Sequence, residues 1–275
     1  MGFAGVARQT ALLTAVALYT ALAGAPVLWV AMMSLRTTSE IAAAPFGWPS
    51  PAHWGKYWTV WTTSHYDTYF WNSTVIVVGA VAGLTLIGSM AAHALARYRF
   101  RGNRVIYFVL FSAIIFPPQL TIISLFQVLV EYGLFNTRLG VSLVYMAIQL
   151  PLTFYLLEGF FAQIPQDYFD AAKIDGCSEL GMYWRLTVPI GMPAIATTVI
   201  LNLIELWNEF LYAVVLVTDD DKRTLPLGIM RFLGDKLEDV GMIATGMMIA
   251  ILPVILVYAF LSERLIRGMT ASVLK

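Results

Sequence analysis

Long apolar stretches alternate with polar segments along the chain, and six of these stretches are long enough to cross a lipid bilayer. Spanning about 30 Å of hydrocarbon takes roughly 20 helical residues. The six expected spans are approximately residues 11–33, 72–95, 105–130, 139–162, 190–217 and 240–261. Because backbone N–H and C=O groups in lipid must bond within their own segment, each span is expected to be a helix. The pattern predicts an all-α membrane protein with six transmembrane helices, organised as a single transmembrane domain over residues 1–275.

One polar segment, residues 163–189, separates the fourth span from the fifth. Its helix-forming stretch Asp170–Lys173 leads to Asp175 and Gly176. Glycine adopts positive φ at little steric cost, so the chain is expected to turn at Gly176. A second amphipathic stretch follows until Pro189, where the next span is expected to begin. The segment therefore predicts a helix, a turn and a second helix outside the bilayer.

Composition supports a membrane location. The 275 residues are 59% hydrophobic and 12% charged, with a mean hydropathy of +0.73, whereas soluble domains are about 25% charged. The formal net charge is zero, and no basic stripe suggests a nucleic-acid partner. The single Cys177 has no cysteine to pair with and no neighbouring Cys or His, so neither an internal disulfide nor a metal site is expected.

Basic residues set the expected orientation. They crowd the loop between the second and third spans and follow the sixth: Arg97, Arg99, Arg101, Arg104, Arg264, Arg267 and Lys275. Short loops rich in Lys and Arg stay in the cytoplasm. Both termini and the 163–189 segment are therefore expected to be cytoplasmic. The outward segments are residues 34–71, rich in aromatic residues and proline, and residues 218–239, which carry Asp219, Asp220 and Asp221.

Polar side chains follow one side of the expected fifth span. At about 100° per residue, most of them fall within an arc of roughly 80°. They are Thr198, Asn202, Glu205, Glu209 and Tyr212, with Asn208 beside them. Ionised carboxylates in hydrocarbon cost several kcal/mol, so Glu205 and Glu209 are expected to face a water-filled cavity, a partner helix or the outer interface. Either these groups line a solute pathway, with Trp207 and Tyr212 stacking on sugar C–H faces, or they hold helices together.

The chain has no sequence motif for its own energy source. No Gly-rich stretch ends in Gly-Lys-Ser or Gly-Lys-Thr, so a phosphate-binding loop is not expected. No internal repeat typical of secondary carriers stands out. We therefore expect a chain that is not an enzyme, carries no cofactor of its own, and depends on another protein for ATP hydrolysis.

Several motifs together resemble the MalG-type permeases of carbohydrate ABC importers. The 163–189 segment resembles their EAA loop, with Asp-Ala-Ala followed by Gly, Leu and Val-Pro at the family's spacings. The resemblance rests on Asp170–Ala172, Gly176, Leu186, Val188-Pro189, Asn72-Ser73, Ala94–Gly102, Phe116-Pro117, Gly133–Thr137 and Trp207–Phe210. Two departures are Asp170, where the family usually has Glu, and Cys177, where Ala is usual.

The resemblance implies a heteromeric importer in a bacterial or archaeal plasma (inner) membrane. Its expected partners are a second homologous permease, two ATPase subunits that bind ATP and Mg²⁺, an extracytoplasmic solute-binding protein, and membrane lipid. The 167–189 loop would couple to the ATPase through Asp170, Ala171, Ala172, Asp175 and Gly176. The 218–239 segment, with Asp219, Asp220 and Asp221, is expected to contact the binding protein.

The expected solute is a mono-, di- or oligosaccharide. A neutral sugar is preferred because no Lys or Arg lies inside any span to meet a phosphate. The main alternative is a polyol phosphate such as glycerol phosphate. Two other classes stay open: a proton-coupled secondary carrier that uses Glu205 and Glu209 as a relay, and a membrane anchor that moves no solute.

Overall fold

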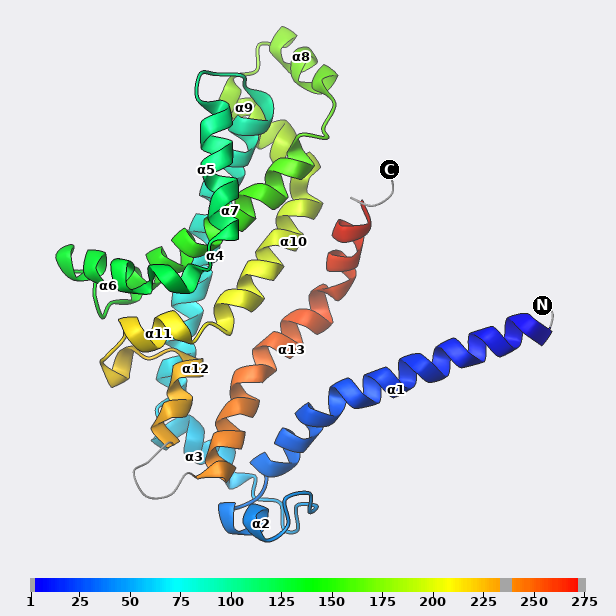
Figure 1. Cartoon of the computed structure of the whole chain (residues 1–275), viewed down its shortest axis with the longest axis vertical. Coiled ribbons are helices and arrows are strands. Elements are labelled where there is room, and N and C mark those ends of the chain that lie inside the picture. The colour runs from blue at the N-terminus through cyan, green and yellow to red at the C-terminus, as the bar shows by residue number, and fades with distance from the viewer. Residues whose placement is uncertain (1–2, 233–238, 272–275) are drawn as a thin grey trace. The chain divides into compact units, whose positions relative to one another are not determined.

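The computed structural model describes residues 3–232 and 239–271 (Figure 1). These residues form helices and no strand, which confirms the all-α prediction. The chain divides into two compact units, one of Met1–Asp67 with Gly228–Leu252 and the other of Thr68–Leu227 with Pro253–Lys275. We call them unit 1 and unit 2. The single domain expected from the sequence stays a prediction.

The helices are short where the chain turns and long where it is apolar. Unit 1 holds α1 (Phe3–Ser34), α2 (Thr38–Ala43), α3 (Gly55–Thr63), η4 (Ile229–Phe232) and the first part of α13 (Val240–Ala271). Unit 2 holds nearly all of α4 (Tyr66–Arg97), then α5 (Asn103–Ile115), η1 (Pro118–Thr121), α6 (Ile122–Glu131), α7 (Arg138–Phe161), α8 (Gln166–Ile174), α9 (Glu179–Met182), η2 (Tyr183–Thr187), α10 (Val188–Trp207), α11 (Leu211–Leu216), η3 (Asp220–Lys222) and most of α12 (Leu225–Gly228).

Five of the described helical stretches are long and apolar enough to cross a membrane, and a bent pair brings the number to six. That pair is the expected third span, residues 105–130. It breaks after Phe116, and the helices on either side meet at 101°. Pro117 and Pro118 lack the N–H groups that would continue the helix, and a residue before proline avoids helical ψ. Phe116 accordingly has ψ 128° and Pro117 has ψ 119°.

The expected fifth span, residues 190–217, also differs from the structure at both ends. Helical backbone runs without a break from Glu179 to Trp207, so Pro189 does not mark a boundary. A π turn over Tyr183–Thr187 precedes it, and such a wider turn accommodates a residue that cannot donate a backbone hydrogen bond. At the other end α10 stops at Trp207, and α11 starts only at Leu211.

A buried apolar cluster joins the helices of unit 2 at the end that carries α8. It contains side chains from α4, α7, α8 and α9 together with Ile164 of the connecting turn: Ala92, Phe154, Leu157, Phe161, Ile164, Phe169 and Met182. Phe169 anchors the amphipathic α8, since it is buried while its neighbours in that helix are exposed. Its position fixes α8 against the ends of α4 and α7.

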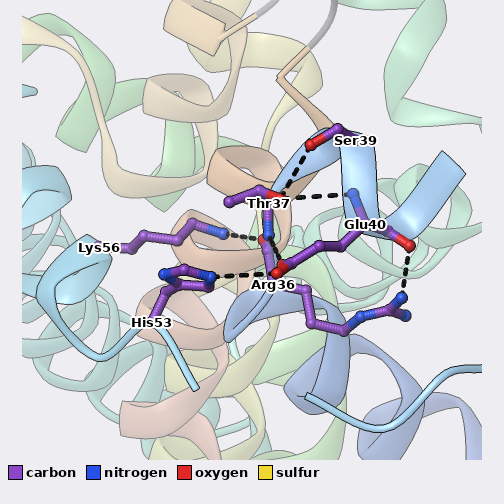
Figure 2. A network of polar contacts seen from close by, with 6 residues as sticks. All are labelled: Arg36, Thr37, Ser39, Glu40, His53 and Lys56. Carbon is purple, nitrogen blue, oxygen red and sulfur yellow. Dashed lines mark hydrogen bonds and ion pairs between the residues drawn. The ribbon is translucent and has the colours of Figure 1, made fainter. Parts of the chain in front are cut away.

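Unit 1 is held by a network of polar contacts where α1 ends (Figure 2). Thr37 and Glu40 form a capping box at the start of α2, and Glu40 also pairs with His53 at 3.3 Å. The Thr37 backbone N–H, followed by His53, lowers the pKa of Glu40 below its usual value. Lys56 Nζ donates to the carbonyls of Arg36 and Gly241, each at 2.6 Å. These contacts join α2, α3 and the start of α13.

Candidate functional site

A cavity of about 720 Å³ lies within unit 2, between the broken helices and α7. Its polar lining includes all five residues expected along a solute pathway: Asn202, Glu205, Asn208, Glu209 and Tyr212. Gln119 and Gln149 add two amides, and Pro118 and Pro151 lie beside them. Among the described residues that line the cavity there is no Lys or Arg. The breaks in the helices thus lie beside a cavity rich in carboxylate and amide groups.

Glu209 has no free carboxylate oxygen. Its Oε1 accepts the backbone N–H of Tyr212 at 2.8 Å. Its Oε2 accepts the hydroxyl of Tyr145 on α7 at 2.8 Å and the N–H of Ala213 at 3.1 Å. The N–H groups of Tyr212 and Ala213 belong to the first turn of α11, where backbone N–H groups have no partner within the helix. Glu209 therefore caps α11 and links it to α7, which explains why the helix breaks before it and restarts after it.

Tyr212 connects this break to the break in the third span. Its buried hydroxyl donates to the carbonyl of Pro118 and lies 3.2 Å from the hydroxyl of Thr121. Because prolines free backbone groups around them, the Pro118 carbonyl needs such a partner in an apolar environment. The side chain that was expected to stack on a sugar is therefore also a structural link.

Asn202 is likewise engaged within the protein. It is buried on α10 and donates to the hydroxyl of Thr153 on α7 at 2.8 Å. This contact fits the expectation that some polar residues of the fifth span hold helices together.

Glu205 and Asn208 are the two expected pathway residues with exposed side chains. The side-chain amide of Asn208 donates to the carbonyl of Ile204 at 2.7 Å, and its amide oxygen can accept a hydrogen bond from another group. Within the described part of the chain, Glu205 makes no hydrogen bond or ion pair. Of the two carboxylates at the cavity, Glu209 accepts hydrogen bonds from the protein, and Glu205 accepts none from the described residues.

Trp207 does not take the role expected for it. It is 7% exposed, does not line the cavity, and packs edge to face on Phe70 of α4 with ring centroids 5.7 Å apart. Trp207 lies before the break at Asn208, on the side of α10 that packs against α4 and not on the side that lines the cavity.

The 163–189 segment forms the expected helix, turn and helix. Asp170, Ala171 and Ala172 lie on α8, and Asp175 caps its end. Gly176 has φ +77°, which confirms the predicted turn residue. Asp170, Ala171, Asp175 and Gly176 are exposed, and Asp170 Oδ1 accepts a hydrogen bond from Gln166 at 3.1 Å.

A shallow depression lies along the same helix. It is lined by Pro165, Asp167, Tyr168, Ala171, Ala172, Asp175 and Leu186. The small side chains of Ala171 and Ala172 in this lining allow another protein surface to approach closely, while the carboxylates of Asp167 and Asp175 offer hydrogen-bond acceptors.

Asp219, Asp220 and Asp221 lie in a turn that is fixed to α4. Asp219 pairs with Lys222 at 2.8 Å and Asp220 with Arg223 at 3.2 Å. The hydrogen bond from Lys222, followed by that from Asn136, lowers the pKa of Asp219. All three aspartates are exposed, so the turn presents acidic side chains on an ordered backbone. Residues 233–238 of the expected 218–239 segment lie outside the described residues.

The contacts that hold this turn come from residues whose role the sequence did not reveal. Asn72 donates to the carbonyls of Asp221 and Arg223 at 2.8 and 2.9 Å, and Tyr69 donates to Asp220 at 2.9 Å. Ser73 accepts the N–H of Leu225 at 2.7 Å. The sequence offered only the polar Asn-Ser pair that opens the expected second span and is part of the family resemblance, and neither feature shows what the pair bonds to. Tyr145, the partner of Glu209, carried no such signal.

No group of three or more His, Cys, Asp or Glu among the described residues is arranged to hold a metal ion. His93, the one histidine in a span, is buried and contacts Thr187 and Tyr98 instead.

Comparison with known proteins identifies the family. Residues 83–271 match the family described as the inner membrane component of binding-protein-dependent transport systems. The chain is 37% identical over 242 residues to the diacetylchitobiose uptake permease NgcG of Streptomyces coelicolor, which covers 87% of this chain and 80% of that protein. It is 31% identical to the trehalose transport permease SugB of Mycobacterium tuberculosis, over 91% of this chain and 92% of that protein.

The fold is also similar to a solved structure. A chain of a bacterial ABC transporter involved in the import of the acidic polysaccharide alginate superimposes with a TM-score of 0.81 at 21% identity, covering 96% of this chain and 98% of that chain. These matches place the protein in a class of membrane-embedded transport subunits. The chain belongs to the family of binding-protein-dependent transport system inner membrane components, as its motifs predicted.

Proposed function

We propose that this chain is a permease subunit of an ATP-driven ABC importer that moves a sugar into the cytoplasm. The observation that carries the proposal is the cavity of about 720 Å³ in unit 2, lined by carboxylate and amide groups, in a chain of this family. Sugar hydroxyls donate to and accept from such groups. The named sugars of the relatives NgcG and SugB support the same solute class.

The solute meets Glu205 and Asn208 rather than Glu209. Glu205 is exposed at the cavity without a partner in the described chain, whereas both oxygens of Glu209 accept hydrogen bonds from the protein. Two carboxylates and the lack of a Lys or Arg among the described lining residues disfavour a phosphate group. A neutral sugar therefore fits this cavity better than a polyol phosphate.

The ATPase docks on α8 and the turn that follows it. Asp170 offers an anionic acceptor to an Arg of the ATPase, and Ala171 and Ala172 allow close approach to the depression beside them. Two ATPase subunits hold ATP and Mg²⁺. Closure of the ATPase pair around ATP moves α8 as a rigid body and switches the permease between inward-open and outward-open arrangements.

The remaining partners follow from the same assembly. A second, homologous permease completes the pathway, and a solute-binding protein contacts the acidic turn with Asp219, Asp220 and Asp221 outside the cell. Both termini and α8 lie on the cytoplasmic side, in agreement with the arginines after α4. Lipid surrounds the exposed apolar faces.

The proposal is tested by sugar uptake into vesicles that contain the whole complex. Glu205→Gln preserves the volume of the side chain but removes its charge, so we expect altered solute affinity and uptake with basal ATP hydrolysis retained. Glu158→Gln is the matched control, because Glu158 is a half-buried carboxylate on α7 that does not line the cavity. Unchanged uptake by Glu205→Gln, or loss of the complex during purification, contradicts the pathway role.

The same vesicles separate the three classes of function. An importer takes up sugar only with ATP and the binding protein. Uptake by this chain alone, driven by a proton gradient, would instead establish a secondary carrier, and an assembled complex that moves no sugar under any condition would establish a membrane anchor.

A further inference from the structure

The end of α4 that carries His93 and Arg97 contacts both sides of the turn at Gly176. α8 precedes this turn, and α9, η2 and α10 follow it as one continuous helical stretch. Along the chain, α8 is linked directly to α7 and, through the turn, α9 and η2, to α10, but α5, η1, α6 and α7 separate it from α4. A movement of α8 would therefore reach α4 only through side-chain contacts.

Arg97 makes the contact on the α8 side. Its guanidinium carbon lies 4.3 Å from the centre of the Phe169 ring, the buried anchor of α8. One of its Nη atoms donates to the carbonyl of Phe161, the last residue of α7. A cation at a helix C-terminus meets unpaired carbonyls and the negative end of the helix dipole, and its stacking on an aromatic ring adds a cation–π interaction. Arg97 thus joins α4, α7 and α8.

His93 makes the contact on the other side of the turn. It is 5% exposed, and its Nδ1 lies 2.8 Å from the hydroxyl of Thr187 in η2. Its ring packs edge to face on Tyr183 with centroids 5.5 Å apart and lies 6.2 Å from Phe169. One turn earlier on α4, Ser89 forms a 2.7 Å hydrogen bond with the Tyr183 hydroxyl. Two successive turns of α4 are therefore hydrogen-bonded to η2.

We propose that Arg97 and His93 are positioning residues that make α4 move together with the coupling helix α8. The inference rests on the proposed docking of the ATPase to α8. With these contacts, a displacement of α8 carries α4 with it. Without them, the displacement passes only to α7 and α10, and ATP hydrolysis is no longer converted efficiently into sugar movement.

The structure favours this role over packing alone because the contacts are polar and directional. An apolar cluster around Phe169 already fills the space between the helices. Arg97 and His93 add hydrogen bonds to Phe161 and Thr187, and these bonds define one relative position of α4 and the coupling segment. Packed apolar surfaces alone allow more sliding.

The test uses the complete transporter in vesicles, with its ATPase, second permease and binding protein. Three variants are compared: Arg97→Met, which keeps an apolar stem but removes the charge, Arg97→Lys, and Arg99→Met as the matched control. Arg99 is exposed, lies two residues beyond the end of α4, and makes no hydrogen bond or ion pair with a described residue. The measurements are copurification of the ATPase, basal ATP hydrolysis, and sugar moved per ATP hydrolysed.

Arg97→Met is expected to assemble and to hydrolyse ATP at the basal rate, but to move about tenfold less sugar per ATP, since coupling between two sites typically corresponds to a factor of 5 to 150. Arg97→Lys, which can still stack and donate one hydrogen bond, is expected to recover part of this loss. Arg99→Met is expected to match the wild type. A merely structural role would reduce the yield of complex without changing sugar moved per ATP.

An assembled Arg97→Met complex with wild-type sugar movement per ATP overturns the proposal. If Arg97→Met does not assemble, Phe169→Leu removes the aromatic ring from the same contact while keeping an apolar side chain. Loss of assembly in both variants also overturns the proposal, because the contact would then be required only for folding. Failure of the proposed function appears differently, as a wild-type chain that copurifies with no ATPase at all.

Discussion

Removing the carboxylate of Glu209 should melt the start of α11. In Glu209→Ala, the N–H groups of Tyr212 and Ala213 lose their acceptor. The hydroxyl of Tyr145, a residue that is 1% exposed, loses its carboxylate partner. Tyr145, Tyr212 and Ala213 are buried, so water does not readily replace the missing bonds. The expected result is a locally unfolded segment between Asn208 and Leu216, with the rest of unit 2 retained.

The size of the effect follows from the bonds lost. A hydrogen bond to a charged group contributes about 1.5–3 kcal/mol, and loss of a helix cap costs about 1 kcal/mol. Because such contributions are not additive, we expect about 3 kcal/mol for the three bonds together. Hydrogen exchange of the α11 backbone amides measures this local opening. They should exchange about 10²-fold faster, since 1.4 kcal/mol corresponds to a factor of ten.

Two variants separate the capping role of Glu209 from a general effect of removing a carboxylate at the cavity. Glu205→Ala removes an exposed carboxylate four residues earlier that makes no hydrogen bond in the described chain, and it should change α11 exchange by less than about threefold. Tyr145→Phe removes one of the three bonds and should give an intermediate increase of about tenfold. Unchanged exchange in Glu209→Ala, or an equal effect of Glu205→Ala, refutes the capping role.

Two further substitutions test the other turns. Gly176→Val should weaken copurification of the ATPase, because a β-branched residue at φ +77° costs at least about 1–2 kcal/mol. Gly159→Val, at an open helical position, should leave copurification unchanged. Wild-type copurification with Gly176→Val would contradict docking of the ATPase at this turn. Asn72→Ala removes two hydrogen bonds and should destabilise the acidic turn by about 1–3 kcal/mol, seen as faster proteolysis within residues 218–225; resistance equal to wild type would count against Asn72 as its anchor.

The sequence predicted what depends on local chemistry. Hydropathy located the long helices, because each span must satisfy its backbone internally. Gly176 predicted a left-handed turn. Each of these features follows from the few residues around it, and each is found in the structure. The family was also recognised from short motifs, and the matches to known permeases confirm it.

Features that depend on distant residues were not predictable in this way. Periodicity placed Glu205, Glu209 and Tyr212 on one helix, but the hydrogen bonds of Glu209 to Tyr145 and to the N–H groups of α11 end that helix at Trp207. Tyr145 lies 64 residues before its partner. The roles of Asn72 and Arg97 likewise appear only when α4 is placed beside segments far along the chain.

The polar residues at the cavity of unit 2 fall into two groups: those whose side chains bond to other parts of the protein, and those whose side chains can still bond to a solute. Every break within an apolar region frees backbone groups, and these groups need partners from the protein. Glu209 caps α11, Tyr212 bonds the carbonyl of Pro118, and Asn202 bonds Thr153. Their positions at the cavity are therefore explained without a solute. Glu205 is not explained in this way, because an exposed carboxylate within a span contributes nothing to the fold and is costly in lipid. That cost is the physical reason why we propose that Glu205, before any other residue of the cavity, meets the sugar.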